Sequence, residues 1–368
     1  MNVHDLESWM IMEPIDYLKK LEKNGHSCFI VGGYVRDTLM GLSSSDIDIA
    51  TSARPSDIVK IFKNTTKESL GSMRIKDSKY TIDVTTYRSE AQYDKRHPKS
   101  IEYLDNVEDD LQRRDFTINA ICMDSKGEIF DPLGGRKDLD AKVIRVIGDI
   151  TSKFEDDPLR ILRAFRLSIL NGFTIEKEAM SFITKNLHLL EKLSYDRRRE
   201  ELDKILISKN ASEGLRFLNQ VGAFEHLGIV VPPVYHEVED LVGAWAQIDA
   251  PNYRFSKVEK MRIENVRRII DIGQINVATL YHYGIYDNTI AGEILRMDKC
   301  HILRMYEQMP IHSIEELAID GNDIMDIMNV REGPIIKRIK KDLIEQVLSG
   351  NLLNSESELS NYIRKNWK

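Results

Sequence analysis

Two neighbouring stretches decide the fold: IVGGYVRD at residues 30–37 and DIDIA at residues 46–50. In the second, polar and apolar residues alternate, so Asp46 and Asp48 share one face of a strand. Two carboxylates side by side are unfavourable unless a cation lies between them. Oxygen ligands on a strand suit Mg²⁺, which takes its other ligands from water and substrate phosphates. The pair therefore predicts a magnesium site for a phosphate-bearing substrate.

The residues around this pair add candidate contacts to the phosphate. Gly32 and Gly33 let the backbone approach a phosphate, and the fork of Arg36 can bind one. Asp83, in an alternating segment at 80–87, is a candidate third carboxylate that polarises an attacking hydroxyl, although a hydrogen-bonded surface role fits it equally well. The set permits nucleotidyl transfer, in which metal ions activate a 3′-hydroxyl and stabilise leaving pyrophosphate.

Outward from these stretches, residues 1–140 have mixed α/β character. The patterns predict helices near 15–21 and 56–62, and strands at 28–31, 46–50, 80–87, 118–123 and 128–130. From Pro158 onward almost every segment is typical of helix, with short polar breaks. The expected fold class is α+β, with a compact α/β head followed by an extended all-α region.

The composition sets weaker limits on function. The 368 residues are 42% hydrophobic, enough for two or more packed units of roughly 100–200 residues each. A net charge of −7 argues weakly against a nucleic-acid partner, but it averages over the whole surface. Two basic stretches, 254–268 and 331–341, fit either a solvated helix face or a strip that contacts phosphates.

The three cysteines, Cys28, Cys122 and Cys300, have no metal or redox spacing, and we expect buried thiols in a reducing compartment. The first residues carry no secretory signal, and no apolar run approaches the ~20 residues of a membrane span. We therefore expect a cytoplasmic protein with no membrane contact. No obligatory protein partner is evident.

Four motifs in fixed order resemble one known family. Residues 30–37 with 46–51 resemble the first motif of class II tRNA nucleotidyltransferases, the CCA-adding enzymes, which share their head and neck motifs with bacterial poly(A) polymerases. Their second, third and fourth motifs are similar to RRDFTINA at 113–120, DPLGGRKDL at 131–139 and DDPLRILRA at 156–164. The third is the family's hinge between head and neck.

The resemblance implies a fold, substrates and residue roles. It implies a polymerase-beta-like nucleotidyltransferase head at 1–140, a base-reading helical neck at 141–206, and a tRNA-binding body and tail at 207–368. The implied substrates are the tRNA 3′ end, CTP and ATP, with Mg²⁺ on Asp46 and Asp48. The implied nucleotide-binding residues are Gly32, Gly33, Arg36, Arg114, Asp157, Arg160, Arg163 and Arg166.

Helical geometry offers a physical reason for the choice of C and A. At 100° per residue, Ile161 and Phe165 fall on one side of the helix after Pro158, while Asp157, Arg160 and Arg163 lie across from them. A carboxylate accepts only from the amino group of C or A, and a guanidinium donates to the adjacent ring nitrogen. Uracil and guanine place a carbonyl against the carboxylate, which is heavily penalised. The alternative is an ordinary surface ion pair.

Several neighbouring functions stay open. Residues 90–98 are polar and end in proline, which predicts a mobile loop similar to that of full CCA-adding enzymes and favours complete CCA addition over CC-only addition. Poly(A) polymerases tend to carry basic extensions that this acidic chain lacks. A small-molecule transferase would not need a base-reading neck, and an inactive RNA-binding protein would not need Asp46, Asp48, Arg114 and Asp157. Asp156 stands where the family usually has glutamate.

Overall fold

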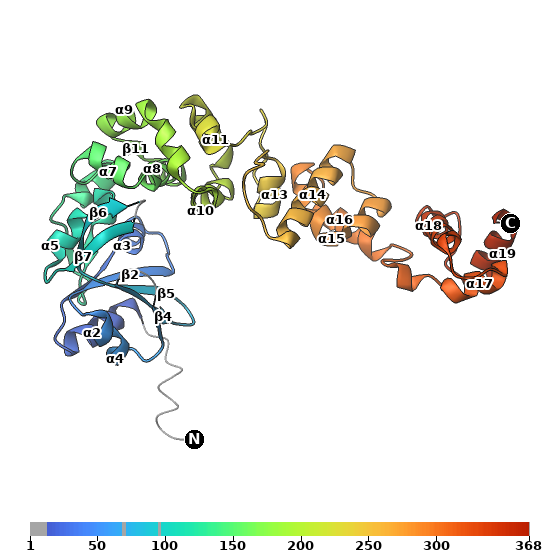
Figure 1. The fold of residues 1–368 in the computed structure, drawn as a ribbon, viewed down its shortest axis with the longest axis horizontal. Helices are drawn as coiled ribbons and strands as arrows, with labels where there is room; N and C mark the ends of the chain where they lie inside the picture. Colours follow the sequence, from blue (N-terminus) through green and yellow to red (C-terminus); the bar gives the residue numbers. More distant parts are fainter. Residues whose placement is uncertain (1–12, 68–70, 95–96, 368) are drawn as a thin grey trace, which may run out of the picture. The chain divides into compact units, whose positions relative to one another are not determined.

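The computed structural model describes residues 13–67, 71–94 and 97–367, with the backbone alone between 90 and 101. The chain forms two compact units (Figure 1). The first comprises Met1–Glu201 and Phe217–Leu227, and the second comprises Leu202–Arg216 and Gly228–Lys368. The predicted boundaries at 140 and 206 do not coincide with this division, and they stay predictions.

A seven-stranded mixed sheet is the framework of the first unit, in the order β3-β4-β5-β2-β1-β8-β9. Its strands are β1 (Cys28–Val31), β2 (Asp46–Thr51), β3 (Thr65–Lys67), β4 (Ser72–Lys76), β5 (Thr81–Thr86), β8 (Cys122–Met123) and β9 (Ile129–Phe130). Only β2 and β5 pair in parallel; the other neighbours are antiparallel. The strands predicted at 28–31, 46–50 and 80–87 are confirmed.

Short helices support this sheet, and α2 and α4 lie together on one side of it (Figure 1). The helices are α2 (Pro14–Lys23), α3 (Gly33–Leu39), α4 (Pro55–Ile61), α5 (Val107–Gln112) and α6 (Gly135–Asp140). Leu18 and Leu21 of α2 are fully buried, as the amphipathic pattern predicts. Val31, Tyr87 and Leu111 belong to one core cluster, in which residues of the sheet region pack against α5.

The rest of the first unit is mainly helical. The chain passes into the second unit within α10, returns to the first unit within α11, and enters the second unit again after α12. Its elements are β10 (Val143–Ile144), α7 (Ile150–Asp156), α8 (Leu159–Asn171), β11 (Thr174–Ile175), α9 (Lys177–Lys185), η3 (Leu187–Lys192), α10 (Tyr195–Leu206), α11 (Ala211–Gln220) and α12 (Ala223–Leu227). The short β11 pairs in parallel with β10, an exception to the helices expected after Pro158.

The second unit is built from helices, as the sequence predicts. They are α13 (Leu241–Ala246), α14 (Lys257–Ile272), α15 (Val277–Ile294), α16 (Lys299–Glu307), η4 (Ile314–Glu316), α17 (Gly321–Met328), α18 (Pro334–Leu348) and α19 (Glu356–Asn366). Ile339, Leu343 and Leu359 belong to a core cluster near the end of the chain. In the part of the chain that the structure describes, no helix is long and apolar enough to cross a membrane.

Three local predictions are wrong. The segment predicted as a loop at 90–98 contributes to an antiparallel hairpin of β6 (Arg88–Asp94) and β7 (His97–Tyr103), with 95–96 outside the described residues, and its mobility stays a prediction. The strand predicted at 118–123 is split into η2 (Thr117–Asn119) and β8, because Thr117 is held by Asp138 and turns the backbone. Cys300 is exposed near the start of α16, whereas Cys28 and Cys122 are buried.

Candidate active site

The predicted catalytic carboxylates lie on two adjacent strands. Asp46 and Asp48 are exposed on one face of β2, and Ile47 between them is buried on the other, which confirms that the two aspartates share a face. The parallel register of β2 and β5 places Asp83 directly beside Asp48. Three acidic side chains therefore project from neighbouring positions of one sheet.

The surroundings of Asp48 concentrate negative charge. Solvent reaches the Asp48 side chain, but the surrounding protein removes part of its hydration and so raises its pKa. The negative charges of Asp83 and Asp46 raise the pKa of Asp48 further. The positive charges of Arg114 and Arg163 act in the opposite direction. The Asp48 carboxylate is thus partly neutralised by arginines and still favours a further cation.

The donor set fits a divalent cation with an incomplete protein shell. Within the described residues, no group of three or more His, Cys, Asp or Glu side chains could hold a metal ion by itself. Asp46 and Asp48 offer oxygen ligands from a rigid strand, and Mg²⁺-type sites often complete their shell with water and substrate phosphates. The site therefore suits an ion that arrives with a nucleotide.

Asp83 has a strong partner of its own. Nε and Nη2 of Arg74, across the β4–β5 pair, donate to its two carboxylate oxygens at 2.8 and 2.9 Å. Such a bidentate pair fixes the orientation of the carboxylate. Each oxygen keeps a lone pair that Arg74 does not use. A catalytic role for Asp83 stays a prediction, and the position of its side chain is well defined.

Gly32 follows the last residue of β1 and lies close to the carboxylate of Asp48. Its φ of +85° and ψ of −145° lie in a region essentially reserved for glycine. A Cβ atom on this residue would lie 2.9 Å from Oδ2 of Asp48. The glycine is therefore required both by the backbone turn and by the close approach of the Asp48 carboxylate. A Cβ atom on Gly33 would meet only an ordinary contact, at 3.6 Å from Nη2 of Arg36.

Arg114 has one donor group without an acceptor among the described residues. Its Nη2 lies 3.3 Å from Oδ2 of the fully buried Asp110, which also accepts a 2.8 Å hydrogen bond from Nε of Arg113. Nε of Arg114 is buried and has no hydrogen-bond partner in the described structure. A buried donor without a partner is costly, so an acceptor on a bound nucleotide is a natural complement.

The arginines of α8 form more hydrogen bonds within the protein than their helical spacing predicts. Ile161, Leu162 and Phe165 are buried, as predicted, but so is Arg160. Arg160 donates to the carbonyl oxygens of Lys153 and Arg113 at 2.8 and 3.3 Å. The expected open polar stripe is therefore partly closed.

The next two arginines of α8 bind carboxylates. Nε of Arg163 donates to Asp115 at 2.6 Å, and Nε of Arg166 donates to Glu201 at 2.6 Å. Their predicted nucleotide contacts stay untested.

Asp157 lies just before α8 and not on it, because its backbone is extended at φ −140° and ψ 91°. Its Oδ1 accepts from the backbone N–H of Leu159 at 3.3 Å, and Nη1 of Arg197 lies 3.8 Å from the same oxygen. The carboxylate remains 23% exposed. It is thus held beside α8 with part of its surface open.

Sequence reasoning missed Asp110, Asp115 and Asn119 as site residues. Burial alone would raise the pKa of Asp115, but the charge of Arg163 and hydrogen bonds from Arg163, Asn119 and the backbone of Phe116 lower it to about 2. Asn119 also accepts from Nη1 of Arg36 at 2.7 Å. The second motif, at residues 113–120, contains Asp115 and Asn119 and is the signal that points to these two residues.

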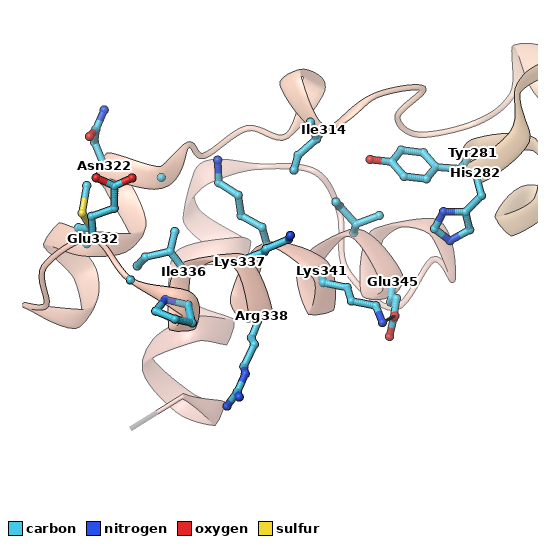
Figure 2. Close-up of a pocket in the computed structure, with 16 residues that line it drawn as sticks. Tyr281, His282, Ile314, Asn322, Glu332, Ile336, Lys337, Arg338, Lys341 and Glu345 are labelled. Carbon is cyan, nitrogen blue, oxygen red and sulfur yellow. Dashed lines mark ion pairs between the residues drawn. The ribbon is translucent and has the colours of Figure 1, made fainter. Parts of the chain in front are cut away.

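The basic stretch at 331–341 borders a cavity of about 840 Å³ within the second unit. Figure 2 shows Lys337, Arg338 and Lys341 of α18 around it, together with Tyr281 and His282 of α15. Lys341 is 3.8 Å from Glu345, one turn along the helix. Cations and aromatic rings at one cavity suit a ligand that carries both phosphates and flat bases.

The stretch at 254–268 is in part structural. Arg267 donates to the carbonyl oxygens of Trp245, Ala246 and Ile248 at 2.6–3.2 Å, where α13 ends. The guanidinium of Arg262 lies over the ring of Tyr286 at 3.9 Å. Arg267 and Arg262 thus contribute to the packing of the helices, and two of the six basic residues of this stretch are no longer candidates for phosphate contacts.

Comparisons with known proteins cover most of the chain. Residues 28–145 match a poly A polymerase head domain, residues 172–229 match a probable RNA and SrmB-binding site of polymerase A, and residues 252–363 match a putative tRNA nucleotidyltransferase domain 2. Nucleotidyltransferases of this family are typically metal-dependent.

Full-length relatives agree with these matches. A CCA-adding enzyme of Ligilactobacillus salivarius is 31% identical, with 95% of each chain covered. The fold matches that of a Bacillus stearothermophilus CCA-adding enzyme in complex with CTP, with a TM-score of 0.84, 24% identity, and 96% and 97% of the two chains covered. A Thermotoga maritima CCA-adding enzyme complexed with tRNA is similar at a TM-score of 0.64 and 21% identity, with 100% and 97% covered.

Proposed function

This chain belongs to the family of CCA-adding enzymes, and we infer from that premise that it adds C, C and A to the 3′ end of tRNA. As a CCA tRNA nucleotidyltransferase it takes the nucleotides from CTP and ATP and releases pyrophosphate. The observation that carries this function to particular residues is the pairing of Asp46 and Asp48 with Gly32 at the end of β1. Because tRNA, CTP and ATP are cytoplasmic, we place the enzyme there.

We propose that Asp46 and Asp48 hold Mg²⁺, which when bound lowers the pKa of the RNA 3′-hydroxyl and neutralises phosphate charge. Asp83 orients the hydroxyl with a lone pair that Arg74 does not use. The 3′-oxygen gives its proton to solvent water and bonds to the α-phosphorus, while the bond from that phosphorus to pyrophosphate breaks and pyrophosphate leaves. Nε of Arg114 donates to an oxygen of the nucleotide, and Gly33 and Arg36 lie on the triphosphate side.

Base choice is assigned to Asp157 and Arg160. Asp157 accepts from the exocyclic amino group that C and A share, and Arg160 donates to the adjacent ring nitrogen. Since Arg160 now donates to the carbonyls of Lys153 and Arg113, reading a base requires it to exchange or share one of these bonds. Arg163 and Arg166 complete this face of the neck at 141–206. Uracil and guanine leave Asp157 facing a carbonyl and are rejected.

We assign tRNA binding to the body and tail at 207–368, with the cavity beside α18 as a contact. Lys337, Arg338 and Lys341 supply positive charge for phosphates, and Tyr281 and His282 supply rings for a base (Figure 2).

Incubation with tRNA that lacks its CCA end tests the function. CTP alone should give two added C, CTP with ATP should then give one A, and UTP or GTP should give no product. Long A tails would identify a poly(A) polymerase instead, and a stop after two C would identify a CC-adding enzyme. A mature tRNA that already ends in CCA is the matched control and should not be extended.

A further inference from the structure

Asn119 is a buried residue for which the reaction scheme above has no role. It ends η2, and only 6% of its surface is exposed. Its backbone N–H donates to the carbonyl of Phe116, and Thr117 in the same turn binds Asp138 of α6 through its hydroxyl at 2.7 Å. Gly135 allows this packing, since a Cβ there would lie 2.1 Å from the Thr117 carbonyl oxygen. Asn119 therefore sits on a firmly held turn.

The side-chain amide of Asn119 forms hydrogen bonds through both its oxygen and its nitrogen. Its oxygen accepts from Nη1 of Arg36 at 2.7 Å, and its nitrogen donates to Oδ1 of Asp115 at 3.2 Å. An amide offers one acceptor and a donor group on the same planar unit. A carboxylate at this position would face the carboxylate of Asp115, and an alanine would leave both neighbours short of a partner.

Each neighbour of Asn119 is connected to a different part of the nucleotide site. Arg36 belongs to α3, which follows Gly32, and it also binds Asp37 through Nε and Nη2 at 2.9 and 2.7 Å. Asp115 follows Arg114 directly, and its second oxygen accepts from Arg163 of α8 at 2.6 Å. A chain of hydrogen bonds thus runs from α3 through Asn119 and Asp115 to α8.

We propose that Asn119 is a positioning residue that fixes Arg36 on the triphosphate side relative to Asp115 and to Arg163 of the base-reading helix. The proposal rests on the function assigned above. Because the amide contacts protein and not a base, its role is the same for CTP and for ATP. It sets the distance between the phosphate contacts and the neck contacts, and it leaves the choice of base to Asp157 and Arg160.

Asn119→Asp and Asn119→Ala test the proposal, since the first keeps the size of the side chain and changes only its donor end. We expect kcat/KM for CMP addition and for AMP addition to fall by the same factor, roughly 10- to 100-fold for lost hydrogen bonds to charged groups. Selectivity against UTP and GTP should be unchanged. Ile118→Val is the matched control, because Ile118 is buried in the same turn outside the hydrogen-bond chain, and its kinetics should stay near wild type.

A purely structural role gives a different pattern. It would lower the unfolding temperature of the Asn119 variants and leave kcat/KM at 20 °C close to wild type, which would overturn the proposal. A loss confined to one nucleotide would also overturn it, because the positioning role is common to both. These outcomes are separate from failure of the proposed function, in which the wild-type chain itself does not add CCA.

Discussion

At the scale of single residues, the carboxylates of β2 are the most direct point of test. Asp46→Ala removes one of two side chains that we propose hold the metal, and it leaves Asp48 to do so alone. We expect the rate of nucleotide addition to fall roughly 10³-fold or more, since several kcal/mol of charge stabilisation are lost. Primer-extension rates at saturating nucleotide measure this, with tRNA binding followed by filter retention.

Asp57→Ala is the control for Asp46→Ala, because Asp57 is an acidic residue of α4 whose partner is the nearby Lys60. It should retain full activity, and tRNA binding should be largely intact in both variants. An Asp46→Ala protein that still extends tRNA would refute the metal assignment.

Gly32 supplies a second test at this scale, with a built-in control. Gly32→Ala and Gly25→Ala both place a side chain at a φ near +85°, so each should cost about 1–3 kcal/mol of stability. Only the new Cβ at residue 32 meets Asp48, at 2.9 Å, whereas Gly25 has no atom within 4 Å. We expect activity to collapse in Gly32→Ala alone. Equal activity of the two variants, measured well below their unfolding temperatures, would contradict the close approach.

At the scale of elements, alternation and periodicity were enough to place β2, β5 and the buried face of α8. They failed where a tertiary contact decides the backbone. The segment at 118–123 has strand-like residues, yet the hydrogen bond from Thr117 to Asp138 and the packing on Gly135 produce a turn. Arg160 was expected on an open face of α8. It is instead buried, and it donates to two carbonyl groups outside this helix. Of these partners, Asp138, Gly135 and Arg113 lie far along the chain, so no local pattern reports them.

The start of α8 is the element on which base choice depends. Asp157→Ala removes the only group that we propose to accept from the amino group of C and A. We expect kcat/KM for CTP and ATP to fall, and the preference over UTP and GTP to shrink from about 10⁴-fold toward 10-fold or less, because no carboxylate then repels a carbonyl. Competition assays with all four nucleotides measure this.

Arg197→Ala is the control for Asp157→Ala, since Arg197 is an ion-pair partner of Asp157 and not a proposed base contact. It should keep the preference for C and A. If Asp157→Ala also retained that preference, base reading would have to be assigned elsewhere.

The end of α13 gives a prediction about stability. Arg267→Met deletes hydrogen bonds to the carbonyl oxygens of Trp245, Ala246 and Ile248, and we expect a loss of about 2–4 kcal/mol in the free energy of unfolding. The adjacent and exposed Arg268→Met carries the same change in charge and length, and it should shift stability little. Denaturant unfolding compares them, and equal stability would return Arg267 to the set of possible phosphate contacts.

At the scale of the whole molecule, we propose a nucleotide site in the first unit and a tRNA contact at the cations of the second. The net charge of −7 conceals this division, because Lys337 and Arg338 of α18 place positive charge at the cavity that Tyr281 and His282 also line (Figure 2). A tRNA engages such a surface mainly through its phosphates, and the release of counterions makes the affinity depend on salt. Contacts far from the reacting atoms add equally to the ground state and the transition state, so they lower KM for tRNA without changing kcat.

The double variant Lys337→Glu with Arg338→Glu tests this division of labour. We expect KM for tRNA to rise roughly 10-fold or more and the slope of log affinity against log salt to become shallower by about 1–2, since about one counterion is released per phosphate contact. The KM for CTP and the value of kcat should stay unchanged, because the proposed nucleotide contacts lie in the first unit. Lys365→Glu with Arg364→Glu makes the same change of charge on α19, away from the cavity-lining residues. An equal rise in KM for both double variants would mean that general attraction, and not this cavity, holds the tRNA.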